Sequence, residues 1–91
     1  MKKRKIASAL TKKGFHSEER SDHTFFILYV NGTKTPIYTK LGRGSKGLKK
    51  SLISAIRKQL KFRDMEGLQG FVDCPITEEE YVAMLRRNGE I

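Results

Sequence analysis

The segment from His23 to Val30, HTFFILYV, constrains the fold more than any other part of the chain, because aromatic and β-branched residues at this density favour a β-strand. Asn31-Gly32 follows it and is the dipeptide that best accommodates the two positive φ angles of a two-residue hairpin turn. We therefore predict an antiparallel pair of strands over His23–Val30 and Thr33–Thr39. Pro36 has no N–H group to donate, which predicts that the return strand lies at a sheet edge or points that position outward.

The hairpin turn also predicts a register. If Asn31-Gly32 is the whole loop, Phe26 pairs with Ile37, Phe25 with Tyr38 and His23 with Lys40. Side chains alternate along a strand, so one set faces a core and the other leaves His23 at the rim of a more open face. The core-facing set is Phe26, Leu28 and Val30, and the other set is His23, Phe25, Ile27 and Tyr29.

Helical patterns flank the strands in the sequence. Residues 3–13 have apolar positions at helical spacing and end at Gly14, and Phe15–Glu19 has the character of a short strand. A second helix is predicted from Leu48 to about Lys61, with a broad apolar arc and a basic arc on its opposite side. The apolar arc contains Leu48, Leu52, Ile53, Ala55, Ile56 and Leu60, together with Gln59, for which the pattern offers no reason.

The C-terminal third is predicted to be irregular over residues 63–76 and helical after that. Thr77 and Glu80 have the spacing of a capping box, and Tyr81, Met84 and Leu85 form an apolar stripe behind it. The whole pattern predicts an α+β fold of order α-β-β-β-α, with a three-stranded antiparallel sheet, helices on one face and an extra C-terminal helix. Ninety-one residues suffice for one modest core, so we expect a single domain over 1–91, with its core at about 3–62 and an extension over 63–91.

Cysteine content and hydropathy indicate the compartment. Cys74 is the one cysteine and cannot form an internal disulfide, so a cytoplasmic location is expected. It also lacks the neighbours that a metal site needs, and we expect a small buried hydrophobe there, with no metal and no cofactor. The apolar part of the N-terminal segment is too short for a signal peptide. The longest apolar run has six residues against the ~20 needed for a membrane span, so no membrane association is expected.

Charge is distributed unevenly along the chain, which has a net charge of +9. Residues 23–63 contain ten Lys or Arg and no Asp or Glu, whereas residues 64–91 contain two basic and seven acidic residues. A long basic segment of this kind indicates that the middle of the chain contacts a polyanion. The alternative is a solvated basic face that keeps the protein soluble.

The segment Gly42–Gly47, GRGSKG, satisfies the G-x-G-x-x-G pattern of dinucleotide-binding proteins. That motif requires a parallel βαβ unit with an acidic residue about 20 positions on, and neither is present in the pattern of this chain. What remains is a group of glycines with Arg43 and Lys46 before a helix, where a phosphate of a nucleic-acid backbone could bind. A flexible connection is the alternative.

His23 is the candidate for chemistry. Metal-free RNA cleavage needs a base for the 2′-hydroxyl proton and an acid for the departing 5′-oxygen, and imidazole has a suitable pKa near neutral pH. Lys40, placed opposite by the predicted register, would stabilise phosphate charge and favour the neutral imidazole. A histidine where a loop meets a strand is also an ordinary structural residue. His16 has less context, so a pair of histidines is not indicated.

Several of these features together resemble the HicA family of toxins. They are Lys13-Gly14-Phe15, the histidine before TFFILYV, Thr35-Pro36 and the Leu52-Ile53 and Gln59-Leu60 pairs of the second helix, within residues 4–62. The resemblance implies a fold similar to the double-stranded-RNA-binding domain, metal-independent cleavage of mRNA, and neutralisation by a HicB antitoxin. It also implies that His23 is the catalytic residue, preceded here by Ser21-Asp22 where the family has Gly-Ser.

We therefore expect an endoribonuclease toxin (an mRNA interferase) whose partners are mRNA and a HicB-like antitoxin. His23 would be its acid/base. Charge and register indicate the residues that grip the RNA backbone, which are Lys40, Arg43, Lys46, Lys50, Arg57 and Lys58. Two other interpretations stay open: a non-catalytic RNA-binding module of the same fold, and an interaction protein whose basic face binds an acidic protein.

Overall fold

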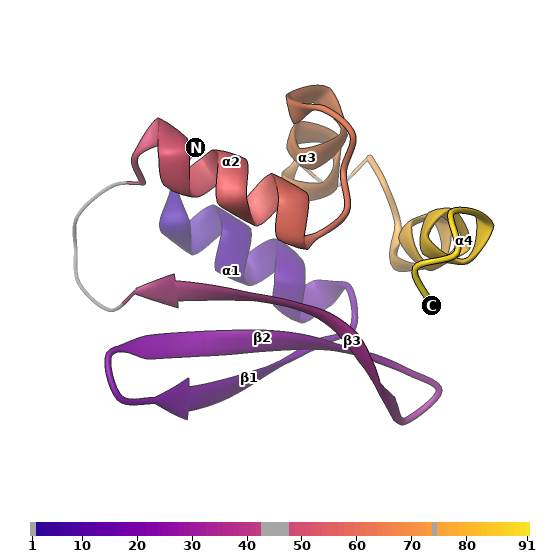
Figure 1. The fold of residues 1–91 in the computed structure, drawn as a ribbon, viewed down its shortest axis with the longest axis horizontal. Helices are drawn as coiled ribbons and strands as arrows, with labels where there is room; N and C mark the ends of the chain where they lie inside the picture. Colours follow the sequence, from indigo (N-terminus) through magenta and orange to yellow (C-terminus); the bar gives the residue numbers. More distant parts are fainter. Residues whose placement is uncertain (1, 43–47, 74) are drawn as a thin grey trace.

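The computed structural model describes residues 2–42, 48–73 and 75–91. The strands form one antiparallel sheet in the order β1-β2-β3, which confirms the expected α+β class (Figure 1). The elements in chain order are α1 (Lys3–Lys12), β1 (Phe15–Arg20), β2 (His23–Val30), β3 (Thr33–Gly42), α2 (Lys50–Gln59), α3 (Met65–Val72) and α4 (Glu78–Arg87).

The helices lie on one side of the sheet, as Figure 1 shows, and the core fills the space between. β2 and β3 bury residues of one face there, including Phe26 and Ile37, whereas β1 contributes Phe15 alone. Residues 63–91, the expected extension, contribute Phe71 and Tyr81 to the same core. No described helix covers the other face of the sheet, which we call the open face. By register it presents His16, Glu18, Arg20, His23, Phe25, Ile27, Tyr29, Lys34, Tyr38, Lys40 and Gly42.

The β2–β3 hairpin begins as predicted and then departs from the expected register. Asn31 and Gly32 have φ angles of 52° and 77°, and Val30 pairs with Thr33 across the turn. Further along, Phe26 pairs with Thr39, not with Ile37. The predicted register is therefore wrong by two residues beyond the first pairs, although the side chains keep the faces that alternation assigned to them.

A bulge centred on Pro36 causes this shift. Leu28 alone spans the stretch of β2 opposite three residues of β3, Thr35 to Ile37. Because Pro36 cannot donate to the ladder, the hydroxyl of Thr35 takes over: it donates to the Leu28 carbonyl at 2.8 Å and accepts from Ile37 N at 3.2 Å. β3 is an edge strand, as Pro36 predicted.

The helix ends follow local signals. α1 stops before Gly14, whose φ of +94° favours glycine, as expected. α2 begins at Lys50 and ends at Gln59, so it is shorter than predicted at both ends. At its C-terminus Lys61 N bonds to the Lys58 carbonyl and Phe62 N to the Arg57 carbonyl, in the pattern of a Schellman motif. Leu52, expected in the core, is 39% exposed.

Gln59 of α2 has a partner that its place in an apolar arc did not suggest. Its side-chain oxygen accepts a hydrogen bond of 2.6 Å from the hydroxyl of Thr39, which is fully buried in β3. The pair joins α2 to the sheet and satisfies a buried polar group.

α3 was not predicted, since two glycines made residues 63–76 look irregular. Asp64 caps this helix by accepting from Gly67 N at 2.9 Å. The glycines allow close packing: a Cβ at Gly67 would lie 3.0 Å from a ring carbon of Phe62, and one at Gly70 would lie 3.1 Å from Ile76 Cδ1. Cys74, expected to be buried, lies outside the described residues.

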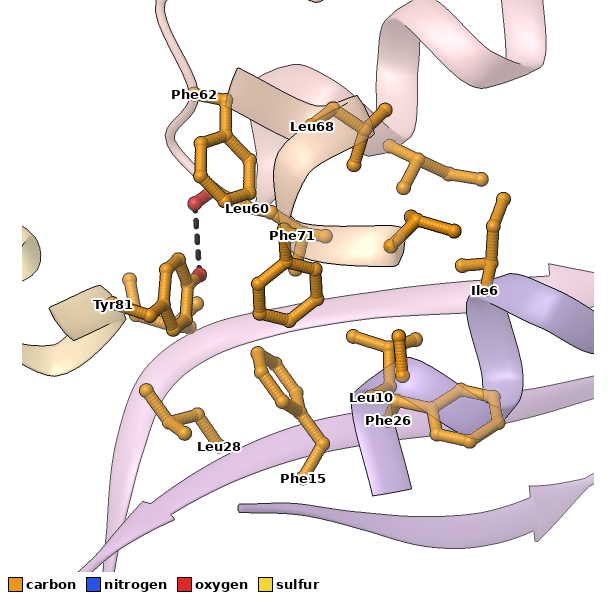
Figure 2. Packing of buried hydrophobic residues seen from close by; sticks show 14 of the residues in the cluster. Ile6, Leu10, Phe15, Phe26, Leu28, Leu60, Phe62, Leu68, Phe71 and Tyr81 are labelled. Carbon is orange, nitrogen blue, oxygen red and sulfur yellow. Dashed lines mark hydrogen bonds between the residues drawn. The ribbon is translucent and has the colours of Figure 1, made fainter. Parts of the chain in front are cut away.

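α4 begins with the predicted capping box of Thr77 and Glu80 and buries Tyr81 and Leu85, with Met84 partly buried. The Tyr81 hydroxyl donates to the Leu60 carbonyl at 2.8 Å, which is the dashed line in Figure 2. Its ring lies 4.9 Å from that of Phe71, between centroids. Four rings form an aromatic cluster that joins β1 to the C-terminal helices, and these are Phe15, Phe62, Phe71 and Tyr81.

Candidate functional site

His23 opens β2 at the edge of the open face and is half-buried. It is not a member of the hydrophobic core. Its Cα partner in β3 is Gly42, and a Cβ added at Gly42 would lie 4.0 Å from His23 Cδ2, so the ring edge passes close to bare backbone. The Gly42 carbonyl accepts a hydrogen bond from the ammonium group of Lys3 in α1. The imidazole thus lies at a corner where the sheet, the start of α1 and the end of β3 meet.

Lys40 does not face His23 directly, contrary to the prediction. The bulge at Pro36 places it opposite Phe25, one diagonal step from His23 on the same face. Diagonal neighbours in an antiparallel pair are about 7–8 Å apart, within reach of a long side chain. Lys40 is exposed, so its ammonium group is accessible from solvent on the side of the sheet that carries His23.

Arg20 is the site residue that the sequence interpretation missed. It is the direct Cα partner of His23 across the β1–β2 turn, in which Ser21 has a φ of 43°. Its guanidinium group lies 4.8 Å from the centroid of the Phe25 ring and 3.1 Å from a carboxylate oxygen of Glu18. The sequence contained a signal for this pairing, because a two-residue turn at Ser21-Asp22 places Arg20 opposite His23.

Aromatic rings form two diagonal rows on the open face. In the first row the Arg20 guanidinium covers Phe25, whose ring is stacked with Tyr38 at 6.1 Å between centroids and 21° between planes. In the second row His16 stacks on Tyr29 at 4.4 Å and 22°. Both rows cross the strands in the same diagonal sense.

A groove of about 430 Å³ runs along the first row, lined among others by Arg20, Phe25, Ile27, Lys34 and Tyr38. Its volume is within the range of about 300–1,000 Å³ typical of ligand pockets. Ile27 forms part of its lining and is only 6% exposed although no described helix covers it, whereas Tyr38 is 47% exposed. The groove therefore combines an apolar lining, an exposed ring and cationic ends.

The remaining predicted grip residues are not all in one place. Lys50 and Lys58 are exposed on α2, which lies on the helix side of the sheet. The guanidinium of Arg57 donates to the carbonyls of Phe62 and Arg63 at 2.8 and 2.9 Å, so it ties down the turn after α2. Arg43 and Lys46 lie outside the described residues.

His16 is separated from His23 on the same face. It pairs with Ile27, four residues along β2 from His23, which is roughly 13 Å in an extended strand. Its ring is stacked on Tyr29. The two histidines therefore do not form an acid/base pair, as expected.

Comparisons with protein-family models, with curated proteins and with solved structures find no match to this chain. None of the helices in the described part of the chain has the length and apolar character needed to cross a membrane. Its function must therefore be inferred from its own residues and their geometry.

Proposed function

We propose that this chain is a small RNA-binding endoribonuclease, the toxin of a toxin–antitoxin pair, which cleaves mRNA with His23 as its acid/base. In this proposal the elements from α1 to α2 form a fold similar to the double-stranded-RNA-binding domain, as in HicA proteins. A HicB-like antitoxin would be the protein partner.

The observation that carries the proposal is the position of His23. Its half-buried imidazole lies at the corner of a sheet face that carries Arg20 opposite it and Lys40 diagonal to it. A phosphodiester in contact with the imidazole would lie within reach of both cations. This is the arrangement that transphosphorylation of RNA needs, since negative charge grows on the phosphate oxygens in the transition state.

The proposed reaction is an attack within the RNA chain. Neutral His23 takes the proton of the 2′-hydroxyl, the 2′-oxygen forms a bond to phosphorus, and the bond to the 5′-oxygen breaks. The imidazolium passes its proton through water to that 5′-oxygen. The products are a 2′,3′-cyclic phosphate and a 5′-hydroxyl, and Arg20 and Lys40 stabilise the charge on the phosphorus oxygens in between.

The first prediction concerns His23→Ala. We expect cleavage of single-stranded RNA, measured in the presence of EDTA, to fall by about 10²–10⁴-fold, because the general base is lost. RNA binding should remain, since the cations and rings of the open face are unchanged. Analysis of the product ends should show cyclic phosphates for the wild-type protein. Met65→Leu, at an exposed position of α3 away from the open face, is the control and should cleave at the wild-type rate.

The possible outcomes separate the competing functions. Equal cleavage by His23→Ala and the wild-type protein would remove His23 from the mechanism. RNA binding by a wild-type protein that never cleaves would identify a non-catalytic RNA-binding module. If the wild-type protein binds no RNA, the remaining interpretation is an interaction protein whose basic face binds an acidic protein.

A further inference from the structure

The open face has two features that one ligand class would satisfy together. Its ring planes are nearly parallel within each row, at 21° for Phe25 and Tyr38 and 22° for His16 and Tyr29. Ring pairs of this kind provide flat surfaces on which an unpaired base continues the stack, and an Arg guanidinium plane serves in the same way. Tyr38 is 47% exposed, so the first row is accessible from solvent.

The charges of the open face are complementary to a phosphate backbone. Arg20, Lys34 and Lys40 are cationic, and Glu18 is the only carboxylate that the register places on the described part of this face. Glu18 is paired with Arg20 at 3.1 Å, and both side chains are about half exposed, at 50% and 53%. An exposed pair of this kind contributes little, so a phosphate can displace the carboxylate from Arg20.

The first row also leads to the proposed catalytic group. Phe25 and His23 are two residues apart in β2 and point to the same side of the sheet. They are therefore separated by roughly 7 Å along the strand. A base stacked in the groove beside Phe25 and Tyr38 would bring its own or the neighbouring phosphodiester to the imidazole.

We propose that the open face is a stacking platform for single-stranded RNA, on which unpaired bases stack along the row Arg20–Phe25–Tyr38 while Lys34 and Lys40 contact the backbone. This inference deepens the proposed function and rests on it for the identity of the polyanion. It assigns the substrate as unpaired RNA, because the bases of a duplex are already stacked and paired. An acidic protein would satisfy the cations but would not require the exposed ring planes.

The test uses the full chain and a single-stranded oligonucleotide of about eight nucleotides with 2′-O-methyl groups, which lacks the nucleophile for cleavage. Fluorescence anisotropy measures its affinity for the wild-type protein and for Tyr38→Leu and Tyr38→Phe. Tyr38→Leu keeps apolar bulk but loses the ring, so we expect its affinity to fall about fivefold or more. Tyr38→Phe keeps the ring and should bind as the wild-type protein does. Met65→Leu replaces an exposed apolar residue of α3 and is the matched control.

Three results would overturn the platform. One is an unchanged affinity of Tyr38→Leu, with circular dichroism showing that the variant is folded. Another is an equal loss of affinity for heparin, a polyanion without bases, because the ring would then not be acting through stacking. The last is tight binding of a blunt RNA duplex that depends on Tyr38 to the same degree.

Failure of the platform and failure of the proposed function are distinguishable. If the wild-type protein and Tyr38→Leu both cleave RNA and bind it with equal affinity, the nuclease proposal stands and the RNA binds at another surface. If RNA binding depends on the Tyr38 ring but the wild-type protein does not cleave RNA, the platform proposal stands and the nuclease proposal is wrong.

Discussion

The hydroxyl group of Tyr81 shows how a single polar atom is accommodated inside this small core. The side chain is fully buried, and its hydroxyl donates to the Leu60 carbonyl at 2.8 Å. Burial, and to a smaller extent the charge of Glu90, raises the pKa of Tyr81 above its usual value of 10.0. The hydroxyl therefore stays protonated in the folded state at pH values where it ionises in the unfolded chain.

This leads to a prediction for Tyr81→Phe. At neutral pH the variant should have a free energy of unfolding about 1–3 kcal/mol lower, because the Leu60 carbonyl loses its donor. Above about pH 10 the unfolded wild-type chain releases a proton that the folded protein keeps, so the wild-type protein loses up to about 1.4 kcal/mol per pH unit from this group. The difference between the two proteins should therefore narrow as pH rises.

Urea denaturation of both proteins between pH 7 and pH 11 measures this effect. Tyr38→Phe, which removes an exposed tyrosine hydroxyl, is the control and should leave stability at neutral pH unchanged. A gap between wild type and Tyr81→Phe that stays constant across the alkaline range would contradict the assignment.

The residues that carry the family resemblance have structural roles in this chain. Lys13 is buried, donates to the Phe71 carbonyl and lies 4.6 Å from the centroid of the Phe71 ring. Gly14 has a positive φ, and a Cβ there would lie 2.9 Å from a carboxylate oxygen of Glu78. Phe15 belongs to the aromatic cluster. Lys13, Gly14 and Phe15 thus determine how α3 and α4 pack against the first half of the chain.

Within β3, the hydroxyl of Thr35 provides hydrogen bonds to the Leu28 carbonyl and to Ile37 N–H, where the bulge interrupts the backbone ladder. Thr35→Val is nearly isosteric, but it leaves Ile37 N–H without its acceptor and the Leu28 carbonyl without that donor. We expect a loss of about 1–3 kcal/mol in the free energy of unfolding, measured by thermal or urea denaturation. Thr33→Val, at an exposed position of the same strand, should change stability by less than about 0.5 kcal/mol.

Hydrogen exchange gives a second measurement of the same variant. Faster exchange at Ile37 and its neighbours in Thr35→Val would show that the bulge has loosened. If Thr35→Val and Thr33→Val were equally stable, the hydroxyl would not be holding the bulge.

The elements that could be predicted were those with strong local signals. The Asn31-Gly32 turn, the stop at Gly14 and the capping box at Thr77 are each determined by residues close in sequence. The register beyond the turn could not be predicted in this way. Pro36 indicates that the ladder is irregular, but the sequence does not show how many residues the bulge contains. α3 was missed because Gly67 and Gly70 serve packing against Phe62 and Ile76, which is a tertiary reason.

The candidate site was predictable only in part for the same reason. Alternation alone placed His23, Phe25, Ile27 and Tyr29 on one face, and this is confirmed. The neighbours of His23 depend on the register of β1 with β2 and on the register of β2 with β3. The second was predicted wrongly, which placed Lys40 opposite His23, and the first was not considered, so Arg20 was overlooked. The diagonal stacking of rings is a result of side-chain conformation in the folded sheet, which the sequence pattern does not specify.

In the molecule as a whole, the acidic C-terminal third folds back onto the rest of the chain, with α3 against α1 and α2 and Tyr81 of α4 bonded to the Leu60 carbonyl. The radius of gyration is 12.4 Å, close to the ~12 Å expected for a compact domain of this length, so α3 and α4 do not trail away from the sheet. Described basic residues remain exposed both on the open face and on α2. RNA affinity should therefore be strongly dependent on salt.

The corresponding prediction concerns the slope of that dependence. For single strands, log K falls with log salt by about 0.7 for each phosphate contacted. We expect a slope of about −2 or steeper for the wild-type protein, and a slope shallower by about 0.7 for Lys40→Ala, measured by anisotropy titrations at several salt concentrations. Lys12→Ala makes the same charge change on α1, away from the open face, and should keep the wild-type slope. Identical slopes for both variants would show that Lys40 contacts no phosphate.

The bulge in β3 also bears on how copies of this protein behave at high concentration. An edge strand with a regular row of free N–H and C=O groups invites a strand from another molecule. Pro36 removes one of those donors and the bulge breaks the regular spacing of the rest, which disfavours the addition of another strand at this edge. The same bulge that shifts Lys40 along the hairpin therefore disfavours pairing between copies of this protein at the β3 edge.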